Sequence, residues 1–187
     1  MKQLDGTGMK RLHREWRRRS EGRLALVLDG VQGPYNVGSI VRTAAAYRVE
    51  HVWLAGATPE LRVPSVQKTA LGTDRYLTST SVEKAVDGIE AARALGYRVV
   101  AIELADDAMP LFELPSAEAT CLVLGHEDHG LAHMTAAACD RLAYLPQLGR
   151  VGSLNVATAG AVAMYEVRRR AWTDPKLGQS MPDDGTD

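Results

Sequence analysis

Short apolar and β-branched runs alternate along this chain with amphipathic or alanine-rich segments, and this alternation constrains the fold more than any other feature. Because such runs form strands and the intervening segments form helices, the pattern predicts an α/β domain with a mostly parallel sheet flanked by helices. The expected strands are residues 24–28, 51–54, 75–77, 97–102, 120–124 and 141–145. The expected helices are residues 37–47, 66–71, 81–95, 131–138 and 154–170.

A chain of 187 residues, 45% of them hydrophobic, is long enough to bury one core. Its longest apolar run is far shorter than the roughly 18 to 20 residues of a membrane span. The basic start of the chain lacks the apolar centre of a signal peptide, so we expect a cytoplasmic protein without a membrane partner. Cys121 and Cys139 lie in apolar or helical segments, which favours two free buried thiols over a disulfide or a metal-binding pair.

Positive charge concentrates at the ends of the chain, although the formal net charge is -1. Residues 1–23 hold eight Lys or Arg against three acidic residues, whereas residues 24–167 hold ten against sixteen. The first segment is therefore a candidate for contacting nucleic-acid phosphates, and the alternative is a solvated, partly frayed tail. Its basic residues at near-helical spacing are Lys10, Arg11, Arg14, Arg17, Arg18 and Arg19, and a second basic cluster is Arg168, Arg169 and Arg170. Residues 171–187 are rich in Pro, Gly, Ser and Asp and are expected to form a disordered tail.

Ligands of such sheets bind beyond the carboxyl ends of the strands, so the loops after Leu28, Leu124 and Leu145 are the places to search. The first loop, residues 29–43, lacks both the glycine spacing of a dinucleotide site and the lysine of a phosphate-binding loop. It does place Asn36 at a helix entry and Arg42 on the following turns of roughly the same flank. An arginine there can grip a phosphate or a carboxylate, and the alternative is an arginine that merely covers a helix surface.

The second loop, residues 124–131, gathers acidic residues and histidines. His129 and His133 are four residues apart, but the helical HExxH arrangement of zinc sites is absent and Gly130 interrupts the local helix. No metal is expected. Glu127, which stands between two glycines, is interpreted as orienting a neighbour such as a ribose hydroxyl or an arginine, and the alternative is a charged surface turn.

The third loop runs from Leu145 into a segment of small residues. Pro146 lacks a backbone donor and should end the preceding strand, while Ser153 is expected to cap the following helix and Asn155 to project from its first turn. The small residues after Asn155 allow another backbone to pack closely. The alternative is a tight loop before an ordinary capped core helix.

Taken together, these loops resemble the three signature motifs of the SpoU-type (TrmH-like) RNA ribose methyltransferases. The matching residues are Asn36-x-Gly38-Ser39-Ile40-x-Arg42-Thr43, Leu124-Gly125-x-Glu127-x-x-Gly130-Leu131 and Pro146-x-x-Gly149-x-x-x-Ser153-Leu154-Asn155-Val156. Their order and spacing match over residues 24–170. The resemblance implies a knotted fold of the SPOUT superfamily with a C-terminal trefoil knot. It also implies bent S-adenosylmethionine in the knot, a homodimer with its site at the interface, and methyl transfer to a ribose 2'-hydroxyl.

The resemblance further implies the roles of individual residues. Arg42 becomes the central catalytic residue, either as a base or as a clamp on an RNA phosphate, because a free guanidinium stays protonated. The supporting catalytic residues are Asn36, Glu127, Ser153 and Asn155. The cofactor is expected to lie against Leu124, Gly125, Leu145, Leu148, Gly149, Ser153 and Leu154, and Arg150 joins the basic residues of the first segment in contacting RNA. Gln147 stands where the family often has an apolar residue.

The substrate is expected to be RNA, and a guanosine of tRNA is favoured over ribosomal RNA. The reason is that residues 1–23 form only a basic RNA-contacting extension before the methyltransferase domain of residues 24–170, where family members acting on ribosomal RNA often carry an additional domain. The remaining alternatives are a non-catalytic RNA-binding knot protein and an enzyme that binds a small nucleotide on a doubly wound sheet.

Overall fold

The computed structural model describes residues 3–20 and 22–173. Its strands are β1 (Arg23–Asp29), β2 (His51–Ala55), β3 (Thr78–Val82), β4 (Arg98–Ile102), β5 (Met109–Pro110), β6 (Ala119–Leu124) and β7 (Arg141–Tyr144). Its helices are α1 (Gly6–Arg18), α2 (Pro34–Ala46), α3 (Pro64–Ala70), α4 (Ala85–Ala94), α5 (His133–Ala138) and α6 (Val156–Thr173), with short 3-10 helices η1 (Thr73–Tyr76) and η2 (Leu111–Glu113). Within this part of the chain, no helix combines the length and the apolar character that crossing a membrane requires.

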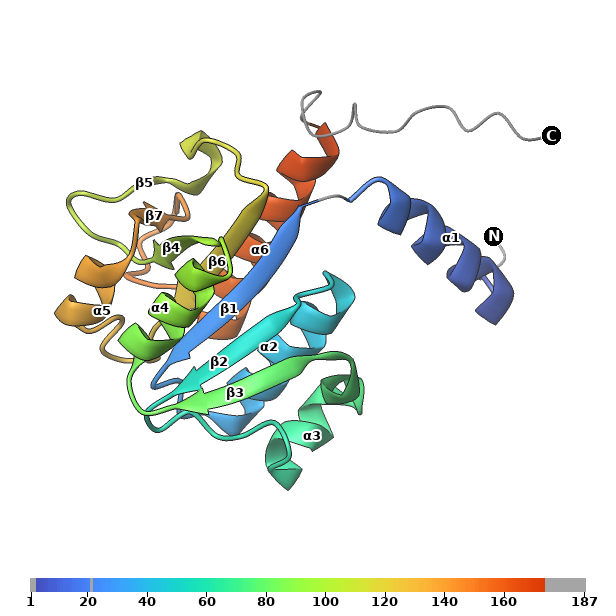
Figure 1. Cartoon of the computed structure of the whole chain (residues 1–187), viewed down its shortest axis with the longest axis horizontal. Helices are drawn as coiled ribbons and strands as arrows, with labels where there is room; N and C mark the ends of the chain where they lie inside the picture. The colour runs from blue at the N-terminus through green and yellow to red at the C-terminus, as the bar shows by residue number, and fades with distance from the viewer. Residues whose placement is uncertain (1–2, 21, 174–187) are drawn as a thin grey trace.

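The strands form one sheet in the order β3-β2-β1-β6-β4-β7-β5, and every paired neighbour is parallel (Figure 1). This arrangement confirms the predicted mostly parallel sheet flanked by helices. Central strand β6 is buried along its whole length, as expected for a strand covered on both faces.

The two faces of the sheet carry separate apolar cores. Leu24, Leu26 and Leu28 of β1 face the core that includes residues of α2 and α6, whereas Ala25 and Val27 face the core built with α4. Alternate residues of a strand point to opposite faces, so one short strand supplies both cores. The sheet is thereby held between two helical layers, which fixes the positions of the loops at its carboxyl edge.

Helix α6 lies unusually close to the sheet because of a glycine. A Cβ atom on Gly160 would stand 2.7 Å from Cδ1 of Leu124 in β6. The small residues after Asn155 were expected to let another backbone approach closely, but the tight contact at Gly160 is with the Leu124 side chain.

Arg168 of α6 is buried, at 5% exposure, at the amino edge of the sheet. Its guanidinium donates to the carbonyl oxygens of Tyr47 at 2.8 Å and Arg48 at 2.9 Å, and also to that of Gly22. Burial lowers the pKa of Arg168, and the nearby Arg48 lowers it further. Arg169 pairs with Glu166 at 2.7 Å. These contacts withdraw Arg168 from the predicted basic cluster of residues 168–170.

Several predicted boundaries are wrong. Residues 75–77 were expected to be a strand, but η1 ends at Tyr76 and the strand β3 follows at Thr78–Val82. This strand pairs only with β2 and is mostly exposed, so the polar sequence of an edge strand gave no apolar signal. The helix expected at 81–95 begins at Ala85, after β3 and a bend. Strand β5 has two residues and was not anticipated.

The two ends of the chain also differ from expectation in detail. Residues 1–23 contain a regular helix, α1, whose first turn is capped by Asp5 accepting from the Gly8 backbone N–H at 2.7 Å. Helix α6 continues to Thr173, so the first three residues of the expected tail, 171–173, are helical. The remainder of that tail, 174–187, lies outside the described residues.

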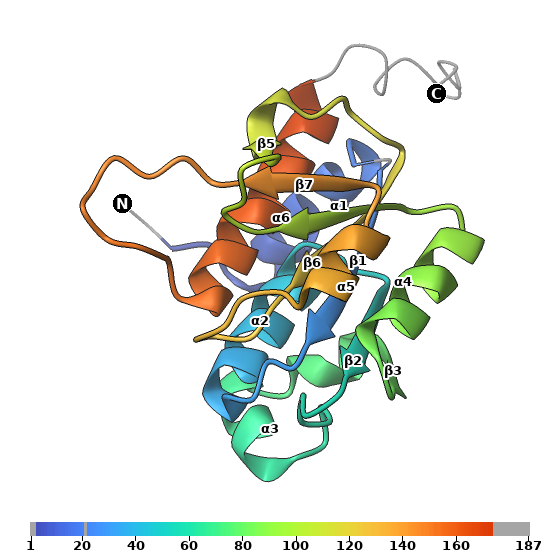
Figure 2. The ribbon, with the colours of Figure 1, turned by 90° about the vertical axis from the view of Figure 1, so that its left-hand side faces the viewer.

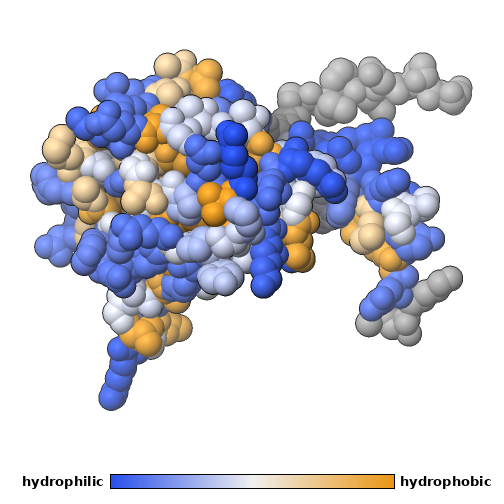
Figure 3. Space-filling view, turned by 90° about the horizontal axis from the view of Figure 1, so that it is seen from below, coloured by the Kyte–Doolittle hydropathy of each residue, from blue (hydrophilic) through white to orange (hydrophobic). Residues whose placement is uncertain are grey.

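Helix α1 stands beside the main body, and none of its residues is buried (Figure 1). Trp16 packs against Trp172 of α6, with ring centroids 5.0 Å apart, and Ser20 accepts from the Trp172 indole N–H at 2.6 Å. Apolar residues of α1 show on the surface between hydrophilic neighbours, on the right of Figure 3. The helix therefore offers both a basic and an apolar surface.

Candidate functional site

The three motif loops meet at the carboxyl edge of the sheet, and the carboxylate of Glu127 is their meeting point. Its Oε1 accepts from the Gly33 backbone N–H at 2.9 Å and from the Asn36 side-chain amide at 2.9 Å. Its Oε2 accepts from the Gln32 backbone N–H at 3.2 Å. Because Gly33 is the N-cap of α2 and has no side chain to offer, Glu127 of the second loop caps this helix in its place.

Asn36 and Asn155 continue this contact to the third loop. The Asn155 amide donates to Oδ1 of Asn36 at 3.0 Å, and Oδ1 of Asn155 accepts from the backbone N–H groups of Ala157 at 3.0 Å and Thr158 at 3.2 Å. Asn155 therefore caps α6, which corrects the expectation that Ser153 does so and that the helix begins at 154. The result is one polar chain from Glu127 through Asn36 and Asn155 to the start of α6.

The electrostatics of this polar chain keep Glu127 ionised. Burial on its own raises the pKa of Glu127, but the hydrogen bonds from Asn36 and from the backbone N–H groups of Gly33 and Gln32 lower it below its ordinary value. A carboxylate is also stabilised by the positive end of a helix dipole. Gly33 is needed because a Cβ atom at this position would stand 2.7 Å from Oε1 of Glu127.

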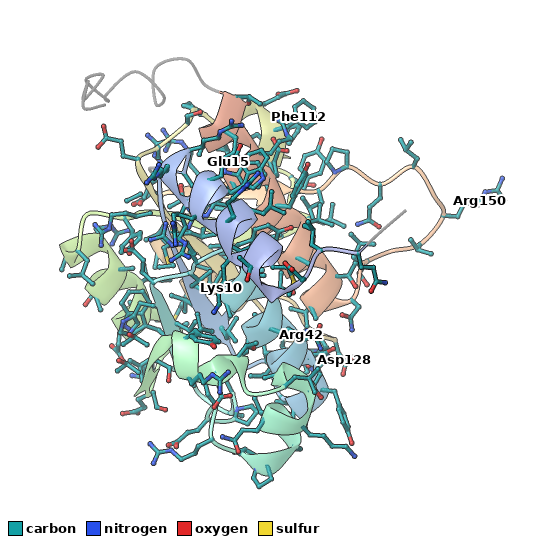
Figure 4. All side chains as sticks on the ribbon, turned by 90° about the vertical axis from the view of Figure 1, so that its right-hand side faces the viewer. Lys10, Glu15, Arg42, Phe112, Asp128 and Arg150 are labelled. Carbon is teal, nitrogen blue, oxygen red and sulfur yellow. The ribbon has the colours of Figure 1, made fainter. Side chains whose placement is uncertain are left out.

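Arg42 lies further along α2 and is exposed to solvent (Figure 4). In the described part of the chain, its guanidinium makes no hydrogen bond or ion pair within the protein. The structure therefore joins three of the predicted catalytic residues, Asn36, Glu127 and Asn155, and leaves Arg42 free on the helix that they anchor.

A pocket of about 90 Å³ lies between the carboxyl ends of β4 and β7 and the start of α6. Three residues predicted to bind the cofactor, Leu145, Ser153 and Leu154, line it. The complete lining is Ile102, Glu103, Leu104, Tyr144, Leu145, Gln147, Ser153, Leu154 and Ala159. Ser153 thus belongs to the pocket and not to the helix cap.

Glu103 and Gln147 are pocket residues that the sequence motifs did not identify. Glu103 accepts from the backbone N–H groups of Leu104 at 3.0 Å and Leu131 at 2.8 Å, so it ties the loop after β4 to the loop after β6. Its position directly after a predicted strand was the available signal. Gln147 carries a buried Oε1 that has no hydrogen-bond partner among the described residues.

The other predicted cofactor residues lie outside the lining of this pocket. Leu124 is buried in the core beneath α6, and Gly125 is held against Gly130, where a Cβ atom would stand 2.5 Å from a backbone carbon. Leu148 is fully exposed, at 103%, on the long loop between β7 and α6 that projects from the body in Figure 2. Gly149 lies on the same loop, and Arg150 points away from the body at its tip (Figure 4).

The histidines of the second loop stack on one another. The rings of His126 and His129 are 4.9 Å apart, and Nδ1 of His126 accepts from the Asp128 backbone N–H at 3.0 Å. His133, the other histidine considered at the sequence level, begins α5. Within residues 3–20 and 22–173, no three His, Cys, Asp or Glu side chains gather in a way that could hold a metal ion. Cys121 is buried and Cys139 half-buried, and both are free thiols, as predicted.

The predicted RNA-contacting residues of the first segment lie on α1 or at its end. Arg19 pairs with Glu15 at 3.0 Å, and Arg17 donates to the His13 carbonyl at 3.4 Å. The other four are exposed and make no ion pair among the described residues, and Figure 4 labels Lys10 on this helix. These four are Lys10, Arg11, Arg14 and Arg18.

Comparison with known proteins gives consistent matches. The profile of the SpoU rRNA Methylase family matches residues 23–165. The tRNA (guanosine(18)-2'-O)-methyltransferase of Escherichia coli strain K12 is 29% identical over 79% of this chain and 63% of its own length. Among the first curated relatives, this chain spans 54% to 63% of the length of each protein.

Solved structures give matches of the same kind. An AdoMet-bound rRNA methyltransferase from Sinorhizobium meliloti superimposes with a TM-score of 0.75 at 31% identity, over 81% of this chain and 58% of the other. A structure concerned with the 2-OH methylation of C/U34 on tRNA superimposes with a TM-score of 0.72 at 30% identity, over 82% of this chain and 98% of the other. The names or titles of all three refer to RNA methylation, and each match covers about four fifths of this chain.

Proposed function

This chain belongs to the SpoU rRNA Methylase family, and on that premise we propose that it transfers a methyl group from S-adenosylmethionine to a ribose 2'-hydroxyl of RNA. The observation that carries the proposal is the polar chain from Glu127 through Asn36 and Asn155. These hydrogen bonds hold the start of α2, the helix that carries the exposed Arg42, against the loops that border the pocket. Three motifs far apart in sequence are thereby assembled into one site.

The residues that line the pocket suit the chemistry of the proposed cofactor. Its walls are mostly apolar, and the buried Oε1 of Gln147 offers an unused acceptor to a ligand. Leu145, Ser153 and Leu154 would hold the cofactor on the side of the third loop, and Leu104 and Tyr144 would hold it on the side of β4 and β7. When bound, S-adenosylmethionine supplies a methyl group that its sulfonium has already activated.

The residues of this chain would supply alignment and charge. Arg42 is free to grip an RNA phosphate and to stabilise negative charge as it develops on the ribose oxygen. The proton of that oxygen would then pass to water or to the phosphate, because a guanidinium is already protonated and has no acceptor for it. Asn36, Glu127 and Asn155 act through position: they hold the amino end of α2, and Ser153 shapes the pocket wall.

The favoured substrate is a guanosine of tRNA, as for the E. coli relative. Methylation of ribosomal RNA is the second candidate, because the AdoMet-bound structural neighbour is an rRNA methyltransferase. The neighbour that this chain covers almost completely concerns positions C/U34 of tRNA, which also supports tRNA. Methylation of total RNA from a strain lacking the gene, followed by nuclease digestion and mass spectrometry, identifies the modified nucleotide.

The proposal includes a trefoil knot and a homodimer in the cytoplasm. Support for the knot comes from the path of α6, which returns from β7 to pack on β6 and α2. Support for the dimer comes from Val162 and Tyr165 of α6, which remain 45% and 46% exposed although they are apolar or aromatic. An isologous pair is the usual way to cover such a surface. Sedimentation at micromolar concentration should give a dimer, and a fully active monomer would exclude it.

Arg42→Ala is the main test. Because Arg42 is exposed and unpaired within the described protein, the variant should fold normally and bind S-adenosylmethionine within a few-fold of the wild type. Methyl transfer should fall by at least about 100-fold if Arg42 stabilises the transition state. Calorimetry and a tritium-transfer assay measure the two properties. Near-normal turnover would remove Arg42 from the mechanism.

The basic side chains of α1 would provide most of the affinity for RNA phosphates. Replacing Lys10, Arg11, Arg14 and Arg18 by Gln keeps the helix and its Trp16 contact, and should reduce the slope of log affinity against log salt by roughly 2 to 4. A matched control replaces the exposed Arg62 and Arg75 by Gln and should leave the slope nearly unchanged. An unchanged slope in the α1 variant would move the RNA surface elsewhere.

A further inference from the structure

Gln147 presents a buried acceptor that the protein itself leaves unused. Its Oε1 is shielded from water and has no partner within residues 3–20 and 22–173, where no other buried side-chain nitrogen or oxygen is left in this state. A carbonyl removed from water without a partner costs free energy comparable to a lost hydrogen bond. Such a group is retained at a cost to the unliganded protein, and a ligand that donates to it recovers that cost.

The surroundings of Gln147 indicate what the donor is. The pocket that it lines is walled mainly by apolar side chains, among them Leu104, Tyr144 and Leu154. The carboxylate in the lining, that of Glu103, already accepts two backbone N–H groups. The free acceptor is therefore a neutral amide oxygen in an apolar pocket, which suits a neutral N–H donor on a flat apolar ring better than an ammonium group.

We propose that the side chain of Gln147 binds the adenine of S-adenosylmethionine by accepting a hydrogen bond from its 6-amino group, and so contributes to cofactor selectivity. This inference rests on the proposed function, because it requires the cofactor to enter this pocket. Gln147 follows β7, which pairs with β4, and the two strands lie side by side in Figure 2 with α6 next to them. Gln147 thus lies where the chain leaves the sheet, just before the exposed Leu148 of the projecting loop.

The test uses the full chain and two ligands: S-adenosylhomocysteine, and its analogue in which hydrogen replaces the 6-amino group. Wild-type protein should bind the amino-lacking analogue about tenfold more weakly, which is the effect expected of one lost hydrogen bond in a buried site. Gln147→Met should bind S-adenosylhomocysteine about tenfold more weakly than wild type and should no longer distinguish the two ligands. Calorimetry gives these affinities.

Thermal unfolding without ligand supplies an independent measurement. Because Gln147→Met removes an unpaired buried acceptor and keeps the side-chain length, its Tm should rise by about 2–4 °C. Opposite changes in stability and affinity distinguish a ligand contact from a structural role. Gln67→Met on α3 is the matched control: it removes the exposed hydrogen bond from Gln67 to Asp74, and it should leave ligand affinity unchanged and should not raise the Tm.

The outcomes separate the two proposals. Wild-type protein that does not bind S-adenosylhomocysteine overturns the proposed function and this inference with it. Wild-type protein that binds both ligands equally, or a Gln147→Met variant that keeps the wild-type preference, overturns the role of Gln147 alone. If the variant fails to fold, the comparison of the two ligands on wild-type protein still decides the inference.

Discussion

The two ends of α2 are each held by a charged side chain from a distant part of the sequence. At its amino end, Glu127 accepts from backbone N–H groups of Gly33 and Gln32. At its carboxyl end, Arg168 donates to the carbonyl oxygens of Tyr47 and Arg48. Both charges interact favourably with the helix dipole, and both side chains bond to backbone groups that a helix end leaves free.

The difference between the two ends lies in what remains available. Arg168 is buried and its guanidinium donates to carbonyl oxygens, so this end of the helix has a structural role and offers no contact to a ligand. Glu127 is only partly buried and shares its contact with Asn36 and Asn155, at the edge where the pocket opens and Arg42 is exposed. The same physical device therefore stabilises the fold at one end and organises a site at the other.

The largest expected effect is on stability, from Arg168→Met. The substitution keeps much of the side-chain volume but leaves three carbonyl oxygens without the donor that the buried guanidinium supplies, which should cost about 3 kcal/mol of unfolding free energy. This corresponds to a decrease in Tm of roughly 10 °C for a chain of this size. Thermal denaturation followed by circular dichroism measures it, and S-adenosylmethionine affinity of the folded fraction should be unchanged.

Arg169→Met provides the control for this end of the helix. Arg169 pairs with Glu166 at 2.7 Å, and its replacement should destabilise the protein much less than Arg168→Met, because its guanidinium satisfies no backbone carbonyl. If Arg168→Met lowered the unfolding free energy as little as this control, the buried guanidinium would not stabilise the end of α2 as its contacts indicate.

At the amino end of α2, the expected loss of stability is small and the expected loss of activity is large. Glu127→Ala should lower unfolding free energy by about 1–2 kcal/mol, through loss of charge-assisted hydrogen bonds, but should lower methyl transfer by about 100-fold because α2 is no longer held in register. A double-mutant cycle with Asn36→Ala should give a coupling energy of about 1 kcal/mol. Additive effects of the two substitutions would show that the carboxylate and the amide act independently.

The sequence predicted the amino end of α2 well because its signal is local and chemical. Glu127, Asn36 and Asn155 stand at fixed spacings within loops that follow apolar strands, and parallel strands bring such loops to one edge. The sequence could not predict which of these residues contact one another. The relative placement of the three loops decides that Glu127 contacts Asn36 and not Arg42, and that Asn155 caps α6.

The carboxyl end of α2 illustrates the complementary failure. Arg168 was grouped with Arg169 and Arg170 as part of an exposed basic cluster, because three consecutive arginines carry no sign of which one turns inward. Its partners are backbone carbonyls, which every residue has and no motif records. Likewise, the polar sequence of β3 hid an edge strand that is defined by its pairing with β2 and not by burial.

The next prediction concerns the helix that continues the polar chain. Asn155→Ala should cost about 1 kcal/mol of unfolding free energy, since it removes the cap of α6. Ser153→Ala should cost less than about 0.5 kcal/mol, because this exposed side chain caps nothing. Urea denaturation of the two variants measures both values, and a reversed order would return the cap to Ser153.

The smallest expected effect is a difference between the two ends of α2 in how their contribution to the unfolding free energy depends on pH. The folded-state pKa of Glu127 lies below its ordinary value of about 4.3, so the stability it contributes is fully present above that value and is lost as pH falls through the folded pKa. Arg168 stays protonated over the same range, so its end of the helix responds to pH through its charge interaction with Glu50. Glu50 and Asp140 also have lowered pKa values and add acid sensitivity of the same sign, which makes a difference measurement necessary. Unfolding free energies of wild-type protein and Glu127→Gln should therefore converge between about pH 5 and pH 3, whereas the difference between wild-type protein and Arg168→Met should narrow much less. Parallel curves for wild type and Glu127→Gln would mean that the ionised carboxylate does not stabilise the start of α2.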